Sequence, residues 1–590
     1  MEPVIVASSE NTGSHRPAGI VGRADFARLQ AGDAPVNVVS PTDSMVWETR
    51  DGAVSVGCRY RGRRCGAVLA SGTRVMAYFG NLGRRAVQVQ QILACDDQQI
   101  PELNEIFSLA LWDGQKQELL LATDRYGNLP LFYLHRAGKL QFASEVKSLL
   151  SLPGERTGLN RQVLAELLAF ECPLTDETLF EGIRKVPPGT ILRFSRTGVR
   201  EERYWSLRFQ PAPPGEKLAV LDLADECFSE ALGRACSAPR TAIALTGGID
   251  TRAMLAAVMK RGLKVDTFTT GVANAADMSL ATQLSSCAGG THHRLVVGQW
   301  LLDDFERHAR EIVRLAEGGI TLHHTHLLSQ VMTVPKWFDV LVDGGCVEVS
   351  KRGPLRRASR GLKPDDDLPG FIMKAWGDMT LLKALLAGEE SVEAEERLRR
   401  KVAGVCADVG QEHTHDTIDA FFMRVVWPNR YGPQVALQNN FLEGQLPFLD
   451  HWFMDAVARL RVEWREKALF QFYAVQKNAP QLKRFGRVFA NLRVPWVDEY
   501  LPKYVLPGLN LVWTRLGLPG FDRPNFPTRR WWRRELNGRL NRAFRTLDER
   551  GVFGPARVSA LLRPGAVSPA SLDRAASVLW MIELWLEEFT

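Results

Sequence analysis

The sequence predicts an α+β sandwich followed by an α/β domain with a helical C-terminal part. Between about residues 45 and 210, short apolar runs are bounded by Gly, Pro, Asp and Asn, which is typical of antiparallel strands and turns. After the Pro-Ala-Pro-Pro-Gly stretch at 211–215, strand and helix patterns alternate. Beyond about residue 350 the pattern is mostly helical. A chain of 590 residues is too long for one core, since a domain takes roughly 100–200 residues.

The N-terminal elements are short. The first 44 residues are rich in Gly, Pro, Ser and Asn, and we expect an irregular segment there. Strands are predicted at 119–122, 130–134 and 190–194, with a helix at 160–168. These elements place a first domain at 45–210 and a linker at 211–216.

The second domain is predicted at 217–500. It begins with a helix at about 217–236, and further strands are expected at 241–245, 264–270 and 294–297, with helices at 251–261 and 277–288. This alternation indicates a parallel sheet with right-handed crossovers. Residues 501–590 are predicted to form a helical, Arg/Trp-rich C-terminal extension.

Composition excludes several classes of protein. No run of 18 apolar residues lacks a charge, so no transmembrane helix is expected. The first residues lack a basic region followed by an apolar one, so no secretory signal is expected either. The nine cysteines are scattered without a C-x-x-C pair, as expected for reduced thiols in a cytoplasmic protein. A formal charge of +7 suits anionic ligands such as nucleotides but does not indicate a nucleic-acid partner.

The segment that carries the chemistry is Thr-Gly-Gly-Ile-Asp-Thr at 246–251, at a predicted strand-to-helix junction. Backbone N–H groups and the helix dipole favour an anion there, and two glycines let the backbone approach phosphate oxygens. Asp250 can hold Mg²⁺. An ordinary βα turn is the alternative interpretation. A dinucleotide fingerprint and a Walker A loop are excluded by the missing third glycine and the missing Gly-Lys-Ser/Thr.

This segment resembles the PP-loop of ATP pyrophosphatases, specifically of asparagine-synthetase-like enzymes. Residues 104–113 resemble the family's Gly-x-Phe-Ala-x-x-x-Trp-Asp, 124–133 its Asp-Arg-x-Gly-x-x-Pro-Leu-Tyr-Tyr, 142–150 its Phe-Ala-Ser-Glu-x-Lys-x-Leu, and 446–450 its Pro-Phe-Leu-Asp. The pieces follow in the family's order over roughly residues 50–500. The resemblance implies an Ntn-hydrolase-like glutaminase sandwich followed by a PP-loop synthetase domain of the adenine nucleotide alpha-hydrolase-like fold.

The resemblance also implies an AMP-forming carbon–nitrogen ligase that uses ATP and Mg²⁺. A carboxylate is adenylated and an amine then attacks it. The residues implied to bind nucleotide are Leu245, Thr246, Gly247, Gly248, Asp250, Thr251, Thr269, Gly271, Asp343, Gly344 and Gly345. Asp250 and Asp343 are implied as metal ligands, and Glu348 and Lys467 as catalytic residues.

The chain departs from the family at the glutaminase nucleophile. The family uses an N-terminal cysteine, whereas Glu2 stands at position 2, and Cys58 and Cys65 lie inside the domain. We therefore expect no glutaminase activity. Relatives with this loss include β-lactam synthetases, carbapenam synthetases and lasso-peptide cyclases. Natural-product biosynthesis such as lasso-peptide macrolactam formation is predicted, with a small-molecule or peptide carboxylate as substrate and a precursor peptide and a protease as partners. Amidation in sugar or exopolysaccharide modification is the alternative.

A second departure concerns the phosphate-side motif. The family's Gly-Glu-Gly-x-Asp-Glu is replaced by Asp-Gly-Gly-Cys-Val-Glu at 343–348, so Cys346 stands where a metal-binding aspartate is expected. If Glu348 takes over the acidic role, catalysis survives; otherwise the chain is a nucleotide-binding pseudo-enzyme. Lys467 best matches the register of the family's pyrophosphate lysine, and Lys477 and Lys483 are competitors.

Two other clusters have simpler interpretations. His292 and His293 are expected on opposite faces of a strand, and the His323-His324-Thr325-His326 cluster is interpreted as pocket lining rather than a zinc site. Arginines and tryptophans at 529–545 favour a helix whose indoles pack on the core, with membrane-surface contact as the less favoured alternative.

Overall fold

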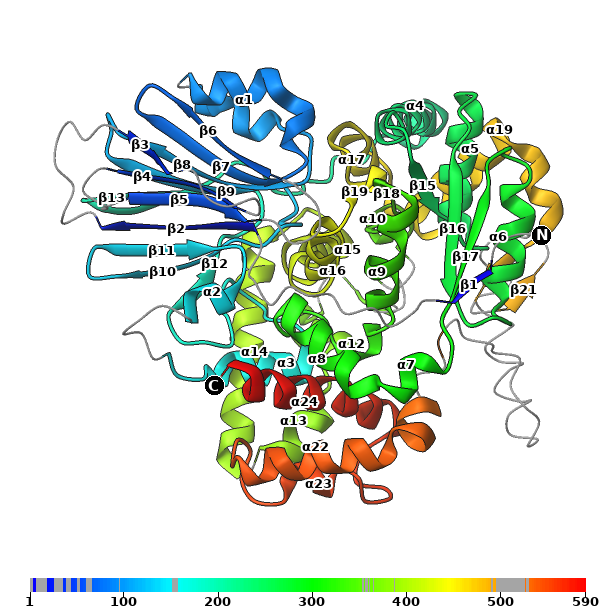
Figure 1. Cartoon of the computed structure of the whole chain (residues 1–590). Helices are drawn as coiled ribbons and strands as arrows, with labels where there is room; N and C mark the ends of the chain where they lie inside the picture. Colours follow the sequence, from blue (N-terminus) through cyan, green and yellow to red (C-terminus); the bar gives the residue numbers. More distant parts are fainter. Residues whose placement is uncertain are drawn as a thin grey trace.

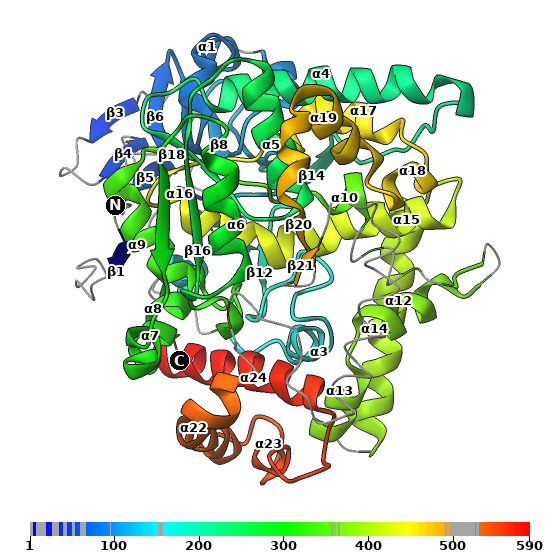
Figure 2. The same ribbon diagram turned by 90° about the vertical axis from the view of Figure 1, so that its right-hand side faces the viewer.

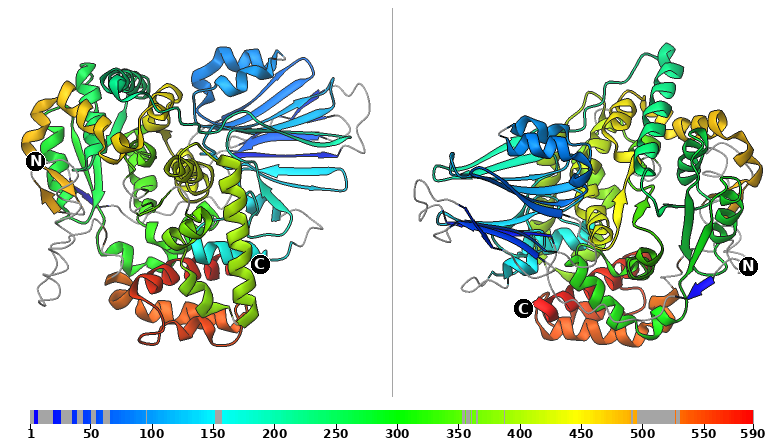
Figure 3. Two further views of the ribbon diagram at one scale, coloured as in Figure 1. Left: turned by 180° about the vertical axis from the view of Figure 1, so that it is seen from behind. Right: turned by 45° about the horizontal axis from the view of Figure 1, so that its top comes forward.

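The computed structural model describes residues 4–6, 19–25, 35–38, 44–49, 54–59, 66–94, 96–150, 157–352, 355, 359, 361–363, 366–386, 388–489, 492–494, 526 and 530–589. Two stacked antiparallel sheets form one side of the molecule, and a parallel sheet flanked by helices forms the other (Figure 1). Figure 3 shows the same division from behind and from above, with helices of the region 414–439 between the two halves. An α+β half followed by an α/β half is therefore observed, in the predicted order.

The two antiparallel sheets belong to the first half of the chain. One has the order β12-β10-β11-β2-β5-β4-β3 and the other β14-β13-β9-β8-β7-β6. The strands of the first are β2 (Gly19–Asp25), β3 (Pro35–Val38), β4 (Ser44–Thr49), β5 (Val54–Arg59), β10 (Phe132–Arg136), β11 (Lys139–Ala143) and β12 (Ile183–Lys185). Those of the second are β6 (Gly66–Ser71), β7 (Arg74–Gly80), β8 (Phe107–Asp113), β9 (Glu118–Thr123), β13 (Thr190–Ser195) and β14 (Gly198–Arg203).

Strand alternation explains how the second sheet is buried on both faces. In β7, Val75 and Ala77 belong to the core between the sheets, whereas Met76 and Tyr78 belong to a separate core. That outer core is completed by α1 (Ala86–Leu93). Because successive side chains of a strand point to opposite faces, one apolar run supplies both cores.

The expectation of an irregular segment over residues 1–44 is wrong for the residues described there. β2 lies between β11 and β5, with Ile20 and Ala24 buried in the inter-sheet core, and β3 forms the end of that sheet. β1 (Val4–Val6) pairs in parallel with β17 (His292–Val296) of the other half. Pairing with distant strands supplies the hydrogen bonds and burial that the local Gly- and Pro-rich composition does not signal.

The parallel sheet has the order β1-β17-β16-β15-β18-β19. Its further strands are β15 (Thr241–Ala244), β16 (Asp266–Gly271), β18 (Val340–Val342) and β19 (Glu443–Gln445). The helices α4 (Lys217–Ala235), α5 (Ile249–Lys260) and α6 (Ala276–Ser285) confirm the predicted alternation. From β15 the chain builds outward through β16 and β17 on one side and through β18 and β19 on the other. The carboxyl ends of β15 and β18 therefore meet at a topological switch point, where open parallel sheets bind ligands.

The two histidines of β17 face opposite sides, as predicted. His292 Nδ1 lies 2.9 Å from Thr267 Oγ1 on β16, whereas the His293 ring packs against Trp337 and Phe338. Burial lowers the pKa of His292 to about 4, so the ring is neutral in the folded protein.

The pKa of His292 predicts a pH dependence of stability. Its value in the unfolded chain is about 6.5, so the unfolded state binds more protons between pH 6.5 and 4. Stability from this group is full above pH 6.5 and is lost as pH falls toward 4, by up to about 3 kcal/mol. Urea denaturation of His292→Asn across this range should show a flatter pH profile than the parent protein. His413→Asn, at an exposed histidine, should keep the parent slope. Parallel profiles for the parent and His292→Asn would contradict the prediction.

The C-terminal part is helical and covers one end of both halves. α22 (Asn537–Glu549) packs on α24 (Pro569–Phe589), and α24 contacts α8 (Phe305–Ala316) and α3 (Arg161–Phe170) (Figures 1 and 2). Trp531 and Trp532 are buried, and the Trp532 ring packs against Phe305 and Trp580. Residues 530–589 therefore form part of the shared core rather than a detached extension. Residues 495–525, where the predicted domain boundary falls, lie outside the described residues.

Within the described residues, no helix combines the length and apolarity needed to cross a bilayer.

Candidate functional site

The Gly-Gly loop lies at the carboxyl end of β15, where the predicted nucleotide site was placed. Leu245 N donates to Phe268 O at 2.8 Å, and the Thr269 hydroxyl donates to Leu245 O, so two bonds to β16 fix the start of the loop. Thr246 N donates to Thr251 Oγ1 at 3.0 Å, which ties the loop to the first turn of α5. These bonds explain why Thr246, Thr251 and Thr269 occur here: their hydroxyls shape the turn.

The amide groups of this loop are already bound by protein oxygens. Gly247 N donates to Asp277 Oδ1 at 2.7 Å, and Gly248 N donates to Thr246 Oγ1 at 3.2 Å. An anion that uses these amides must therefore displace Asp277 and Thr246 Oγ1. Asp277, at the start of α6, was not predicted as a site residue, and only its position near the end of β16 hinted at it.

Two carboxylates and one lysine meet beside the loop. The Lys351 ammonium pairs with Asp250, and Glu348, one turn earlier on α10 (Glu348–Lys351), is electrostatically coupled to both. Burial raises the pKa of Glu348; Lys351 lowers it and Asp250 raises it further. Oδ1 of Asp250 and Oε2 of Glu348 are buried and accept no hydrogen bond. Two orphaned carboxylate oxygens in one cluster are the donor type that Mg²⁺ prefers, and this fits the predicted metal at Asp250.

Lys351 is a candidate site residue that the sequence did not predict, and it contacts Asp250. The predicted lysine, Lys467, has an exposed side chain at the turn after α18 (Val462–Glu466), and its catalytic role stays a prediction. The two competitors bond elsewhere: Lys477 pairs with Asp222 and Asp225, and Lys483 bonds Gln476. The signal for Lys351 was its spacing of three residues from Glu348, which puts both on one face of a helical turn.

The loop after β18 brings the second predicted motif to the switch point. Asp343 N donates to Gln445 O of β19 at 2.9 Å, and the Asp343 carboxylate accepts hydrogen bonds from Gly345 N and Gln438. Burial raises the pKa of Asp343. Gly344 packs so closely on α5 that an added Cβ would lie 3.5 Å from the Thr251 methyl and 3.3 Å from Met254 Sδ. Asp343 thus closes the loop on itself, and its role as a metal ligand stays a prediction.

Cys346 belongs to the apolar core beside Glu348. Its thiol is buried in the core against Met423, at a left-handed φ of 63°, and burial raises its pKa well above the usual value. A neutral thiol in an apolar setting does not replace a metal-binding aspartate. Of the acidic residues at 343–348, Glu348 is the one that interacts electrostatically with Asp250.

The widened helix η5 (Phe422–Tyr431) bounds the site on its other side. Trp427 stacks on Tyr431 with ring centroids 5.5 Å apart, and a Cβ on Gly345 would lie 3.2 Å from the Trp427 ring. Burial and nearby Glu348 raise the pKa of Tyr431 to about 12, so its hydroxyl stays protonated. Wide helical turns of this kind are uncommon and often occur at functional sites.

Gly271 ends β16, and its carbonyl accepts a hydrogen bond from Val297 N. Its role in nucleotide binding stays a prediction. His323, His324 and His326 are half-buried in the helical part, where desolvation lowers the pKa of His324 to about 4 and of His326 to about 3. The His326 ring stacks on Phe526 at 3.7 Å. The described residues hold no cluster of three or more metal-binding side chains.

Known proteins are similar to parts of this chain. Residues 87–205 match the family model of a glutamine amidotransferase domain. The chain is 27% identical over 270 residues to asparagine synthetase [glutamine-hydrolyzing] 3 of Bacillus subtilis, covering 42% of this chain and 43% of the relative. It is also 27% identical over 330 residues to a putative asparagine synthetase [glutamine-hydrolyzing] of Mycobacterium bovis, covering 53% and 48%.

The chain is similar to asparagine synthetases. It spans less than half the length of the two curated relatives, so their activities do not transfer to it directly. Among solved structures, a glutamine phosphoribosylpyrophosphate amidotransferase from B. subtilis, complexed with ADP and GMP, aligns at 13% identity over 48% of this chain and 61% of that chain. Its TM-score of 0.20 is too low to bear on the fold.

Proposed function

We propose that this chain is an ATP-dependent, AMP-forming amide ligase that adenylates a carboxylate and passes it to an amine. The observation that carries the proposal is the cluster of Asp250, Lys351 and Glu348 at the switch point of the parallel sheet, with two carboxylate oxygens that have no hydrogen-bond partner. The similarity to asparagine synthetases supports the same reaction class.

The chain's own residues would perform separate tasks. Asp250 and Glu348 would hold Mg²⁺, which supplies charge neutralisation for the departing pyrophosphate. Lys351 would leave Asp250 and bind the same phosphate oxygens once the metal takes its place. Displacement of Asp277 from Gly247 N would free a backbone amide for the nucleotide. Each step exchanges a contact within the protein for one to the nucleotide, so ATP and Mg²⁺ are expected to bind together.

The test is ATP–pyrophosphate exchange stimulated by a carboxylate substrate. Asp250→Asn keeps the shape of the side chain but removes its charge, and exchange should fall about 100-fold or more because the metal loses a ligand. Asp303→Asn, at an exposed aspartate outside the site, should retain parent activity. Equal exchange by Asp250→Asn and the parent protein would refute the proposal. Absence of Mg²⁺-dependent ATP binding by calorimetry would instead favour a pseudo-enzyme.

We further propose that the amine does not come from glutamine hydrolysis. Two described cysteines of the antiparallel half are buried: the Cys58 thiol donates to Tyr78 O, and burial raises the pKa of Cys172 to about 12. The Cys172 thiol is therefore not ionised near neutral pH, as a nucleophile would need to be, and the Cys58 thiol is bound to a backbone carbonyl. Position 2 and Cys65 lie outside the described residues.

Glutamine should therefore yield no glutamate above background, whereas ammonium or a substrate amine should support amide formation. Coupled glutamate detection measures this directly, and Cys58→Ser and Cys172→Ser serve as controls. Glutamate release that survives both substitutions would place a nucleophile outside the described residues and contradict this part of the proposal.

Two classes of carboxylate substrate fit the proposed reaction, a peptide and a uronic acid. Closure of a macrolactam in a lasso-like peptide needs a precursor peptide and a partner protease, whereas amidation of a uronic acid belongs to sugar or exopolysaccharide modification. Exchange stimulated by a peptide carboxylate favours the first, and exchange stimulated by a uronic acid favours the second.

A further inference from the structure

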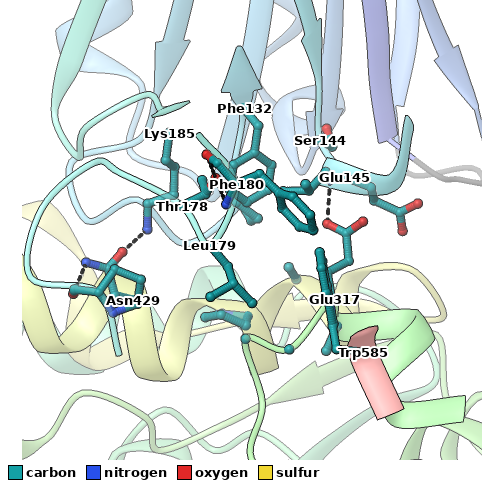
Figure 4. Close-up of a pocket in the computed structure, with 18 of the residues that line it drawn as sticks. Phe132, Ser144, Glu145, Thr178, Leu179, Phe180, Lys185, Glu317, Asn429 and Trp585 are labelled. Atoms are coloured by element: carbon teal, nitrogen blue, oxygen red, sulfur yellow. Dashed lines mark hydrogen bonds between the residues drawn. The ribbon is translucent and has the colours of Figure 1, made fainter. Parts of the chain in front are cut away.

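A cavity outside the candidate site lies between the antiparallel half and the helical part (Figure 4). Its volume is about 130 Å³ without the space that is open to solvent, and no residue of 245–251 or 343–351 lines it. The apolar part of its wall comes mainly from β10, the segment before β12, and α24, through Phe132, Leu179, Phe180, Met581, Ile582 and Trp585. A dry apolar cavity of about 150 Å³ is known to bind benzene, so this cavity is large enough for part of a small apolar molecule.

The charged groups on its wall are already paired. Glu145 and Glu317 both contact Lys147 Nζ, at 2.8 and 3.4 Å, and the Glu317 carboxylate also accepts from Val146 N at 2.6 Å. Lys185 donates to Pro428 O at 3.0 Å and to the Asn429 side chain, as Figure 4 shows for the latter contact. Glu177 pairs with Lys401. A ligand therefore finds no unpaired charge among these groups, and a charged ligand would be desolvated without compensation.

Two neutral polar atoms on the same wall do lack partners. Trp585 is 2% exposed, and its Nε1 donates to no acceptor; Asn440 is 6% exposed, and its Oδ1 accepts from no donor. The amide of Asn440 is oriented by its other atom, since Nδ2 donates to Ala436 O at 3.1 Å. The indole is held against Gly318, where an added Cβ would lie 3.0 Å from Trp585 Cδ1, and against Phe180 at a ring distance of 4.3 Å. Buried polar groups rarely stay unpaired, so both point to a ligand.

We propose that this cavity binds a neutral, mostly apolar molecule that carries a hydrogen-bond acceptor for Trp585 Nε1 and a donor for Asn440 Oδ1. Alkyl amides are the simplest class with both groups. The apolar chain fills the space among the phenylalanines, and the polar groups complete the two open hydrogen bonds. The site is separate from the proposed nucleotide site, so its binding does not depend on ATP.

The experiment titrates octanamide into the full chain without nucleotide and follows binding by calorimetry. Saturable binding is expected, and Leu179→Trp, which fills the cavity, should abolish it. Trp585→Phe keeps the ring but removes the donor and should weaken binding about three- to tenfold, the effect of one hydrogen bond. Trp300→Phe is the matched control, because Trp300 Nε1 is also buried without a partner but does not line the cavity. It should bind like the parent protein.

A second probe keeps the test independent of any variant's folding. N,N-dimethyloctanamide lacks the N–H donor and should bind the parent protein several-fold more weakly than octanamide. No saturable binding of octanamide, equal binding by Leu179→Trp, or equal affinity for both amides would overturn the proposal. Because these measurements use no ATP, failure here leaves the ligase proposal untouched, and failure of pyrophosphate exchange leaves this one untouched.

Discussion

Replacing Asp419 by alanine is expected to destabilise the protein by about 3–5 kcal/mol, because it leaves two buried arginines without their shared partner. Asp419 lies on α15 (Thr414–Phe421) and accepts from Arg352 Nε at 2.7 and 3.0 Å and from Arg465. All three side chains are fully buried. Arg465 also pairs with Asp416, and Arg352 Nη1 donates to Glu466 at 2.8 Å.

This network fixes the helix that carries the site. Arg352 directly follows α10 in a left-handed conformation with φ of 51°, and its ion pairs tie the end of that helix to α15 and α18. Loss of Asp419 should therefore displace Glu348 and Lys351 as well as lower stability. Activity should fall even at temperatures where the variant remains folded.

Thermal melting and urea denaturation measure the effect. The matched control is Asp408→Ala, which removes an aspartate paired with Arg203 at 2.6 Å but 39% exposed. Exposed pairs contribute about 0–1 kcal/mol, so this variant should melt close to the parent protein. If Asp419→Ala and Asp408→Ala melt together, the buried network does not stabilise the fold in the way the contacts imply.

The second large effect is expected at Lys351. Lys351→Met should lower ATP–pyrophosphate exchange by about 10²–10³-fold, the range found when one donor to a developing anion is removed. Methionine retains much of the length of the side chain but carries no charge, so Asp250 and Glu348 would face each other unneutralised. The pKa of Glu348, already raised by burial, should rise further.

Comparing Lys467→Met with Lys351→Met tests which of the two lysines neutralises the pyrophosphate. Lys467 matches the register expected from the family resemblance, whereas Lys351 is the lysine that contacts Asp250. If Lys351 neutralises the pyrophosphate, Lys467→Met should exchange within about threefold of the parent. A large loss in Lys467→Met with little change in Lys351→Met would assign the role to Lys467 and leave Lys351 as a counter-ion of Asp250 alone.

Much of the candidate site could be predicted from sequence because its geometry is local. The loop at 246–251 and the motif at 343–348 each follow an apolar strand, and the ends of neighbouring parallel strands meet at one edge. Their proximity therefore followed from the alternation of strands and helices alone. The oxygens that bind the loop amides could not be predicted, since Asp277 reaches Gly247 N from a different helix.

The strands within the first 44 residues could not be predicted from local sequence. Gly- and Pro-rich composition indicates low local preference for strand, yet β2 lies inside a seven-stranded sheet. Strand preference depends strongly on the neighbours with which a strand pairs, and these neighbours are at least 30 residues away in sequence. The same limit applies to Trp585, whose place on the cavity wall depends on α24 packing beneath the antiparallel half.

The sequence by itself determined the two halves of the molecule and the position of the Gly-Gly loop at a strand end, because hydrophobic periodicity and glycine turns act over a few residues. Only the tertiary structure decided which charged groups meet there. Lys351 reaches Asp250 from α10, whose end is held by the buried ion pair of Arg352 and Asp419. Cys346 packs in the core against Met423, and Lys467 is exposed at the turn after α18. Contacts between residues far apart in sequence therefore determine which of several candidate side chains lies in the site.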